Sequence, residues 1–214
     1  MHIPDGILPL PVTLGGYALS FGAVWFCLHM IKQKEDPRED IPRASLLTAV
    51  FFVISLIHIP IPPTSVHLML GGFLGALLGF FAIPAIMIGL FFQAVMFGHG
   101  GLTTLGVNTV ILGFPALAAH FIFRLRNIGP AGPKKTGFYG FLAGSTATVL
   151  SAVLFALILL TNMPAEFSRS AEQSAIFIFM AAHVPLAIIE GLITAMAAMF
   201  LLRVSPGVLQ GVNP

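Results

Sequence analysis

The residues best placed to do chemistry are the first two, Met1 and His2, which begin the segment Met-His-Ile-Pro-Asp-Gly. The α-amino group, the His2 amide nitrogen and His2 Nδ1 can chelate one metal ion through a five-membered and a six-membered ring. Three nitrogens in one plane suit nickel, copper or low-spin cobalt better than magnesium or calcium, which prefer oxygen. No secretory signal pattern surrounds this segment, so we expect the terminus to be kept. The dipeptide therefore predicts a transition-metal site, the alternative being a frayed end without a role.

A fourth nitrogen donor is expected from His67. This histidine follows the proline-rich segment 59–65 and is predicted to begin a helix, so its approach to a ligand is restricted. The alternative is a helix-start histidine that bonds a backbone carbonyl.

The glycine-rich loop 98–108 is the next candidate, because glycines permit close backbone approach. It can be a structural re-entrant turn or contact the ion. We expect His99 to capture or support the ion without binding it directly, and Asn108 to belong to the same loop. Asp5 could orient His2, but capping of the first helix or a turn with Gly6 is favoured. The spacing of a phosphate-binding loop is absent, so the sequence predicts no nucleotide site.

Two ionisable residues lie in the last apolar run, where Glu190 follows His183 by two helical turns on about the same face. A charge at that depth is costly and usually functional, so Glu190 is predicted to act in coupling, gating or partner contact. The alternative is a structural carboxyl, either neutral or paired with His183.

The composition indicates a membrane protein. Of 214 residues, 57% are hydrophobic and 8% charged, whereas about a quarter of residues are charged in soluble domains. Ten Lys and Arg against eight acids are too few for a nucleic-acid surface. The single cysteine, Cys27, excludes a disulfide or a thiolate cage within the chain.

We predict an all-α polytopic fold in a single transmembrane domain, 1–214, with residues 1–9 as a metal-chelating segment before the first helix. Apolar runs of spanning length predict seven helices, with a tight hairpin near Pro84 and six helices as the fallback. The predicted spans are 10–31, 44–60, 66–82, 84–98, 108–124, 137–161 and 173–202.

The basic residues predict the orientation. Nine of the ten fall on one side of the predicted spans: Lys32, Lys34, Arg38, Arg43, Arg124, Arg126, Lys134, Lys135 and Arg203. The positive-inside rule then places the C-terminus in the cytoplasm and the N-terminus outside. Residues 1–2, His67 and the loop 98–108 fall together on the outer side, which favours uptake across the cell (inner) membrane.

Four segments of this sequence, in this order, resemble the CbiM/NikM family. They are the N-terminal hexapeptide, Val66-His67, the Gly98-His99-Gly100-Gly101 loop through Asn108, and the His183 to Gly191 segment. These are substrate-binding membrane components of energy-coupling factor importers for cobalt and nickel. The resemblance implies a square-planar site made by the Met1 amine, the His2 amide and imidazole, and His67.

The resemblance also implies partners. These are a transmembrane coupling subunit, cytoplasmic ATPases and a small accessory membrane subunit, with the ion as cargo and no resident cofactor. The hexapeptide is more typical of nickel members and the His99 loop of cobalt members; we favour cobalt and keep nickel as the alternative. An intramembrane metallohydrolase is disfavoured, because no HExxH motif is present. A structural or channel-like subunit without a metal site is the remaining alternative.

Overall fold

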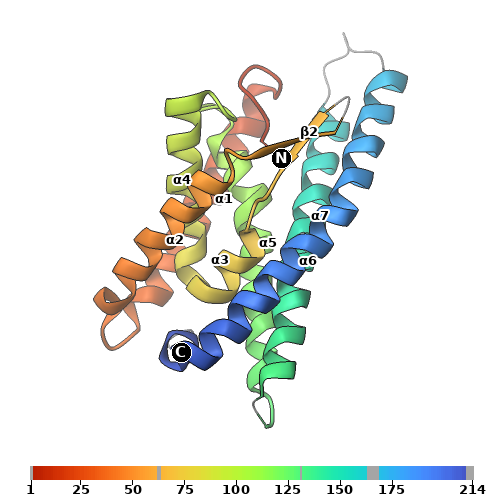
Figure 1. The fold of residues 1–214 in the computed structure, drawn as a ribbon. Helices are drawn as coiled ribbons and strands as arrows, with labels where there is room; N and C mark the ends of the chain where they lie inside the picture. The colour runs from red at the N-terminus through yellow and green to blue at the C-terminus, as the bar shows by residue number, and fades with distance from the viewer. Residues whose placement is uncertain (1, 62–63, 131, 163–168, 211–214) are drawn as a thin grey trace.

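The computed structural model describes residues 2–61, 64–130, 132–162 and 169–210, and these form a bundle of helices with one short β-hairpin (Figure 1). The helices are α1 (Leu10–Lys32), α2 (Ile41–Ile54), α3 (Gly71–Leu78), α4 (Ala82–Phe97), α5 (Leu105–Arg124), α6 (Pro133–Asn162), α7 (Arg169–Val204) and α8 (Pro206–Gln210). Short 3-10 turns are η1 (Pro37–Asp40), η2 (Gly79–Phe81) and η3 (Leu125–Asn127).

Five helical segments within the described residues are long and apolar enough to cross a membrane. They are Leu10–Lys32, Gly71–Phe97, Leu105–Asn127, Pro133–Asn162 and Ser174–Val204. Isolated helices of this length and composition satisfy all their backbone hydrogen bonds internally, as the bilayer requires. The chain is an integral membrane protein with a polytopic helical fold.

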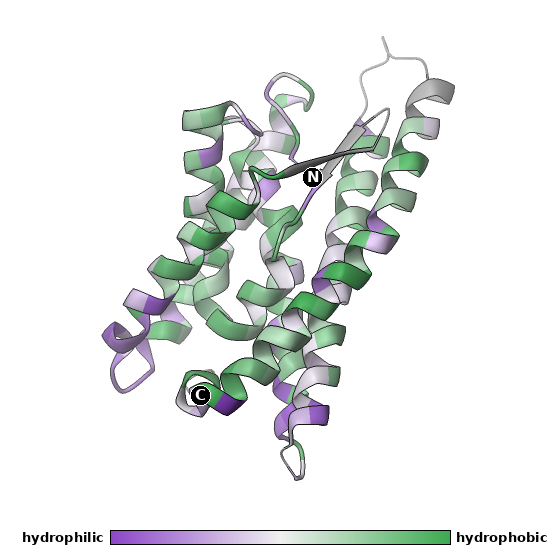
Figure 2. Cartoon of the chain, viewed as in Figure 1, coloured by the Kyte–Doolittle hydropathy of each residue, from purple (hydrophilic) through white to green (hydrophobic). Residues whose placement is uncertain are grey.

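The two ends of the bundle differ in character. One end, here called the hairpin end, carries the N-terminus, the β-hairpin and the loop after α4, and the C-terminus lies at the opposite end (Figure 1). That opposite end, here called the basic end, carries the hydrophilic segments between α1 and α2 and between α5 and α6 (Figure 2). Termini at opposite ends agree with an odd number of passes through the bundle.

The region 58–70 departs from the predicted helices. Strand β1 (His58–Ile61) pairs antiparallel with β2 (Thr64–His67), with His58 opposite His67. Three prolines in this region remove backbone donors and prevent a helix from passing through, while its β-branched residues favour extended backbone. The predicted spans 44–60 and 66–82 are therefore wrong at these ends, and His67 ends a strand instead of beginning a helix.

The predicted hairpin near Pro84 exists, but its turn lies earlier. Helix α3 ends at Leu78, because the following Gly79 has a φ of +58°, and η2 leads into α4. Pro84 lies in the first turn of α4, where its missing N–H is tolerated. Seven of the helices match the seven predicted spans in order, but among the described residues five helical segments are of spanning length. Helix α2 has 14 residues, and α3, with 8, reaches that length only together with α4.

Helix α5 packs against α1, α3, α4 and α6 and so lies at the centre of the bundle. Close approach depends on glycine: a Cβ added at Gly75 of α3 would lie 2.7 Å from the carbonyl carbon of Ala116 on α5. A Cβ at Gly144 of α6 would lie 2.8 Å from Cα of Gly191 on α7. Small residues at such positions let helix backbones touch. Close backbone contacts of this kind hold α3 against α5 and α6 against α7.

Candidate metal site

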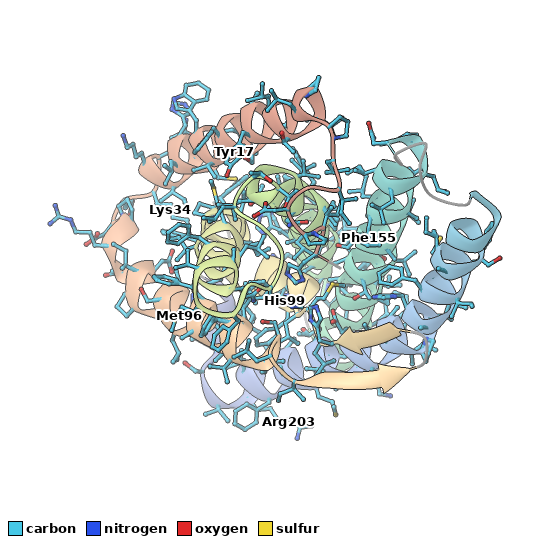
Figure 3. The ribbon with its side chains drawn as sticks, turned by 90° about the horizontal axis from the view of Figure 1, so that it is seen from above. Tyr17, Lys34, Met96, His99, Phe155 and Arg203 are labelled. Carbon is cyan, nitrogen blue, oxygen red and sulfur yellow. The ribbon has the colours of Figure 1, made fainter. Side chains whose placement is uncertain are left out.

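Three histidines from three separate segments meet at the hairpin end. His2 lies in the N-terminal segment, His67 at the end of β2, and His99 in the loop after α4, where it lies over the middle of the bundle (Figure 3). Each offers one ring nitrogen, and the three ligand atoms all lie within 4.8 Å of one another. Two nitrogens on opposite sides of one ion are about 4 Å apart, because metal–imidazole bonds are about 2.1 Å long. The three side chains therefore need little movement to reach one ion.

The rings of these histidines are in direct contact. The centroids of His2 and His67 are 5.1 Å apart and nearly stacked, at 23°. His99 meets both rings edge-on, at 4.4 Å from His2 and 5.2 Å from His67. His99 therefore lies as close to His2 as His67 does, although only a supporting role was predicted for it.

The imidazole of His67 is oriented by its own backbone. Its Nδ1 lies 3.1 Å from the carbonyl oxygen of Leu68, and the residue is buried. When Nδ1 carries the proton and donates it to that oxygen, the lone pair of Nε2 can bind a metal, which is the usual arrangement for ligand histidines. The sequence left a hydrogen bond to a backbone carbonyl and a role as metal ligand as alternatives for His67. In the structure the two are compatible.

The N-terminal segment is fixed next to His2 by a pair of side chains. The backbone N–H of Ile3 donates to Asn108 Oδ1 at 2.9 Å, and Asn108 Nδ2 donates back to the Ile3 carbonyl at 3.0 Å. The hydroxyl of Thr104 donates to the same carbonyl at 2.6 Å. Asn108 lies in the first turn of α5, since this helix begins at Leu105 and not at 108 as predicted. Asn108 therefore pairs with the N-terminal backbone much as a neighbouring strand would.

Asp5 fastens the same segment to the glycine-rich loop. Its carboxylate accepts the hydroxyl of Thr103 at 2.5 Å and the backbone N–H groups of Thr103 at 2.8 Å and Leu102 at 3.1 Å. The Thr103 hydroxyl, with the backbone donors, lowers the pKa of the Asp5 carboxyl. Asp5 lies in a turn with Gly6, as favoured from the sequence. The expected capping of the first helix is wrong, because that helix is preceded by Pro9 and has no side-chain cap.

Glycine lets this loop come close to the N-terminal segment. A Cβ added at Gly101 would lie 2.6 Å from the backbone nitrogen of Asp5, closer than real contacts allow. Gly100 has a φ of +85°, and a Cβ there would lie 3.4 Å from Cβ of His2. The glycine spacing read from the sequence therefore serves a close backbone contact next to His2.

Of the other predicted site residues, His183 and Glu190 lie away from the three histidines. Met1 is outside the described residues, so its amine remains a predicted ligand. His183 bonds within its own helix, with Nδ1 2.7 Å from the Phe179 carbonyl oxygen. The buried Glu190 accepts the backbone N–H groups of Met69 and Leu70. This contact with the segment after His67 joins residues more than a hundred positions apart, and no pattern in the sequence signalled it.

Comparison with known proteins identifies the family of this chain. Residues 2–208 match the family model described as CbiM, the cobalt uptake substrate-specific transmembrane region. The chain belongs to the CbiM family. Relatives of this CbiM-family chain include a putative cobalt transport protein CbiM 1 of Methanocorpusculum labreanum, 33% identical over 98% of this chain and 92% of the relative. The cobalt transport protein CbiM of Sorangium cellulosum is 30% identical over 98% of this chain and 94% of the relative.

Solved structures share the fold. A protein described as a truncated transition metal transporter superposes with a TM-score of 0.73 at 25% identity, covering 95% of this chain and 99% of the other. A second, described as a transition metal transporter, has a TM-score of 0.75 at 24% identity over 95% and 93% of the two chains. The CbiM-family chain thus has the helical arrangement of metal transporters.

Proposed function

We propose that this chain is the substrate-binding subunit of an energy-coupling factor importer and binds a divalent transition-metal ion at its hairpin end. The convergence of three histidine nitrogens within 4.8 Å carries the proposal. His2 and His67 supply imidazole nitrogens, and the predicted N-terminal chelate adds the Met1 amine and the His2 amide. His99 lies close enough to join or replace one of them.

Cobalt is the proposed cargo, with nickel as the second candidate. The relatives' names favour cobalt. A deprotonated amide in a square plane, together with the usual affinity order of divalent ions, favours nickel. Uptake selectivity need not follow affinity, so both ions belong in the test.

The direction of transport follows from the charge asymmetry. The basic end is proposed to face the cytoplasm and the hairpin end the outside. The sequence carries no phosphate-binding loop, so ATP hydrolysis is assigned to partner subunits. One relative is described as a putative fused cobalt transport protein CbiMQ and matches over 97% of this chain but 36% of its own length. That fusion supports partnership with at least one further transport component, for which a transmembrane coupling subunit is proposed. The ATPases and a small accessory subunit are proposed from the resemblance.

The test is a metal titration of the purified chain, with its native N-terminus, in detergent. We expect one Co²⁺ or Ni²⁺ per chain and a d–d absorption band of a nitrogen-rich site. Affinity should fall as the pH is lowered, because the ligand nitrogens must be unprotonated to bind. Absence of binding by the wild-type chain would favour a structural or channel-like subunit.

Two variants and one control sharpen the titration. His67→Ala and a Gly-Ser extension before Met1 should each weaken binding by more than about 100-fold, beyond the loss typical of supporting residues. His29→Ala removes an imidazole in the last turn of α1 and should leave binding unchanged. Full binding by the extended chain would remove Met1 from the site and leave the three histidines.

A further inference from the structure

The segment that joins His67 to α3 has an unusual backbone. Leu70 has a φ of +49° and is the one non-glycine residue with positive φ among those described. Such a conformation is disfavoured for a residue with a branched side chain and persists where surrounding contacts hold it. Met69 and Leu70 are both buried. Something in the bundle must therefore fix this segment.

Glu190 of α7 is the group that holds it. One carboxylate oxygen accepts the N–H of Met69 and the N–H of Leu70, the latter at 3.2 Å. The other oxygen accepts the hydroxyl of Thr148 on α6 at 2.7 Å. Glu190 and Thr148 are each 1% exposed, so these contacts are closed to water. Three elements, α6, α7 and the β2–α3 segment, thus meet at one carboxylate.

The backbone at this point needs such an acceptor. The first N–H groups of a helix have no partner within it, and α3 has no side-chain cap of its own. Glu190 supplies an acceptor from another helix for Leu70, the residue that precedes the first turn of α3, and for Met69 before it. Because a buried carboxyl is costly, its retention here indicates a role that an apolar side chain cannot fill.

We propose that Glu190 is a positioning residue for the ion, whose carboxylate fixes the direction of His67 by clamping the next residues of the chain to α6 and α7. This rests on the proposed function and adds to it that ion affinity depends on where α7 lies. A displacement of α7 would pull on Met69 and turn His67 away from His2 and His99, both of which are attached to other elements.

The test measures Co²⁺ and Ni²⁺ affinity and the d–d band of variants in the full chain. Glu190→Ala should weaken binding about 10- to 100-fold and shift the band, as loss of a supporting partner does in metal sites. Glu190→Gln should stay near wild type. Its amide oxygen can accept the Met69 and Leu70 N–H groups, while its NH₂ donates to Thr148, whose hydroxyl can turn to the Gly144 carbonyl 3.2 Å away.

A second pair of variants covers the case in which Glu190→Ala does not fold. Thr148→Val removes one of the three contacts with the carboxylate and should weaken binding by about threefold or more. The matched control is Ser151→Ala, which removes a buried hydroxyl on the same helix and should have no effect on affinity.

A double variant separates positioning from general destabilisation. If Glu190 acts through His67, His67→Ala/Glu190→Ala should bind no more weakly than His67→Ala alone. Additive losses, or wild-type affinity and band in both Glu190→Ala and Thr148→Val, would overturn the inference. If His67→Ala loses binding while Glu190→Ala and Thr148→Val keep wild-type binding, this inference alone is overturned. If the wild-type chain binds no metal, the proposed function is overturned as well.

Discussion

Two limbs of the chain reach the same site and are held by different kinds of contact. The N-terminal limb, residues 2–6, is tied to the loop 98–104 and to the first turn of α5 by at least six hydrogen bonds from Asp5, Thr104 and Asn108. The His67 limb, residues 64–70, is tied to α6 and α7 by the buried carboxylate of Glu190. The N-terminal limb thus has several attachments, exposed at Asp5 and buried at Ile3, whereas this link of the His67 limb is concentrated at one buried carboxylate.

This difference has a mechanical consequence. Several weak contacts can be lost one at a time, so the N-terminal limb should respond to mutation in graded steps. A single buried contact is lost all at once, because its remaining partners cannot be satisfied by water. On the proposed function, the N-terminal limb would be the fixed side of the site and the His67 limb the side that a movement of α7 could withdraw.

The largest effect on the N-terminal limb is expected from Gly101→Ala. The added methyl would overlap the Asp5 carboxylate and lie 2.6 Å from its backbone nitrogen, so the whole limb must move. We expect a more than tenfold loss of metal affinity and a free energy of unfolding lower by about 1–3 kcal/mol, as for overpacked sites. Metal titration and thermal unfolding check both.

Gly15→Ala is the control for that variant, because a Cβ there meets nothing within 4 Å. It should leave affinity unchanged. Wild-type affinity in Gly101→Ala would show that the N-terminal limb is loosely held, and the contrast between the two limbs would fail.

A smaller effect is expected from Asn108→Ala. The buried N–H of Ile3 would lose its acceptor, while the Ile3 carbonyl keeps the Thr104 hydroxyl. The free energy of unfolding should fall by about 1–3 kcal/mol, and metal affinity should fall less than in Gly101→Ala. Denaturation and titration measure these losses.

The matched control is Thr109→Val, which alters the next residue of the same helix. The Thr109 hydroxyl bonds the Leu105 carbonyl within α5 and is equally buried. A loss of affinity in Thr109→Val as large as in Asn108→Ala would assign the effect to α5 in general and not to the N-terminal limb.

These limbs also show what the sequence could and could not predict. Membrane spans were predictable because each is a long apolar run, and the approach of His2, His67 and the 98–108 loop followed from counting passes. The extended backbone at 58–61 and 64–67 was missed, because these short segments adjoin long apolar runs and were assigned to the ends of the predicted helices. The prolines at 60, 62 and 63 were the available signal, since they remove backbone donors that a helix needs.

The contacts that support the site could not be predicted from the sequence, for a different reason. Each contact joins residues that are far apart along the chain: Asp5 and Thr103, Asn108 and Ile3, and Glu190 and Met69. Hydrophobic periodicity indicates only which residues share a face within one helix or strand. Glu190 was conspicuous as a buried charge, so its importance could be predicted while its partner could not. The position of His99 beside His2 likewise depends on the turn after α4, where Gly98 adopts a φ of +60°.

The smallest effect, and one that separates the limbs by pH, is expected from Asp5→Asn. Bonds from Thr103 and Leu102 lower the folded-state pKa of Asp5 below its ordinary 3.8, so its carboxylate stabilises the fold at neutral pH and loses that contribution as the pH falls through the folded value. Because Asp5 is exposed, we expect less than about 1 kcal/mol, or at most about 4 °C in Tm. Thermal unfolding of the metal-free chain should show a gap between wild type and Asp5→Asn that is constant from pH 8 to about 5 and closes below pH 4. Thr103→Val, which removes the largest cause of the lowered pKa, should make the gap close at a higher pH. Parallel Tm curves down to pH 3 would contradict a contribution of Asp5 to holding the N-terminal limb and would leave its attachment to the buried contacts of Ile3.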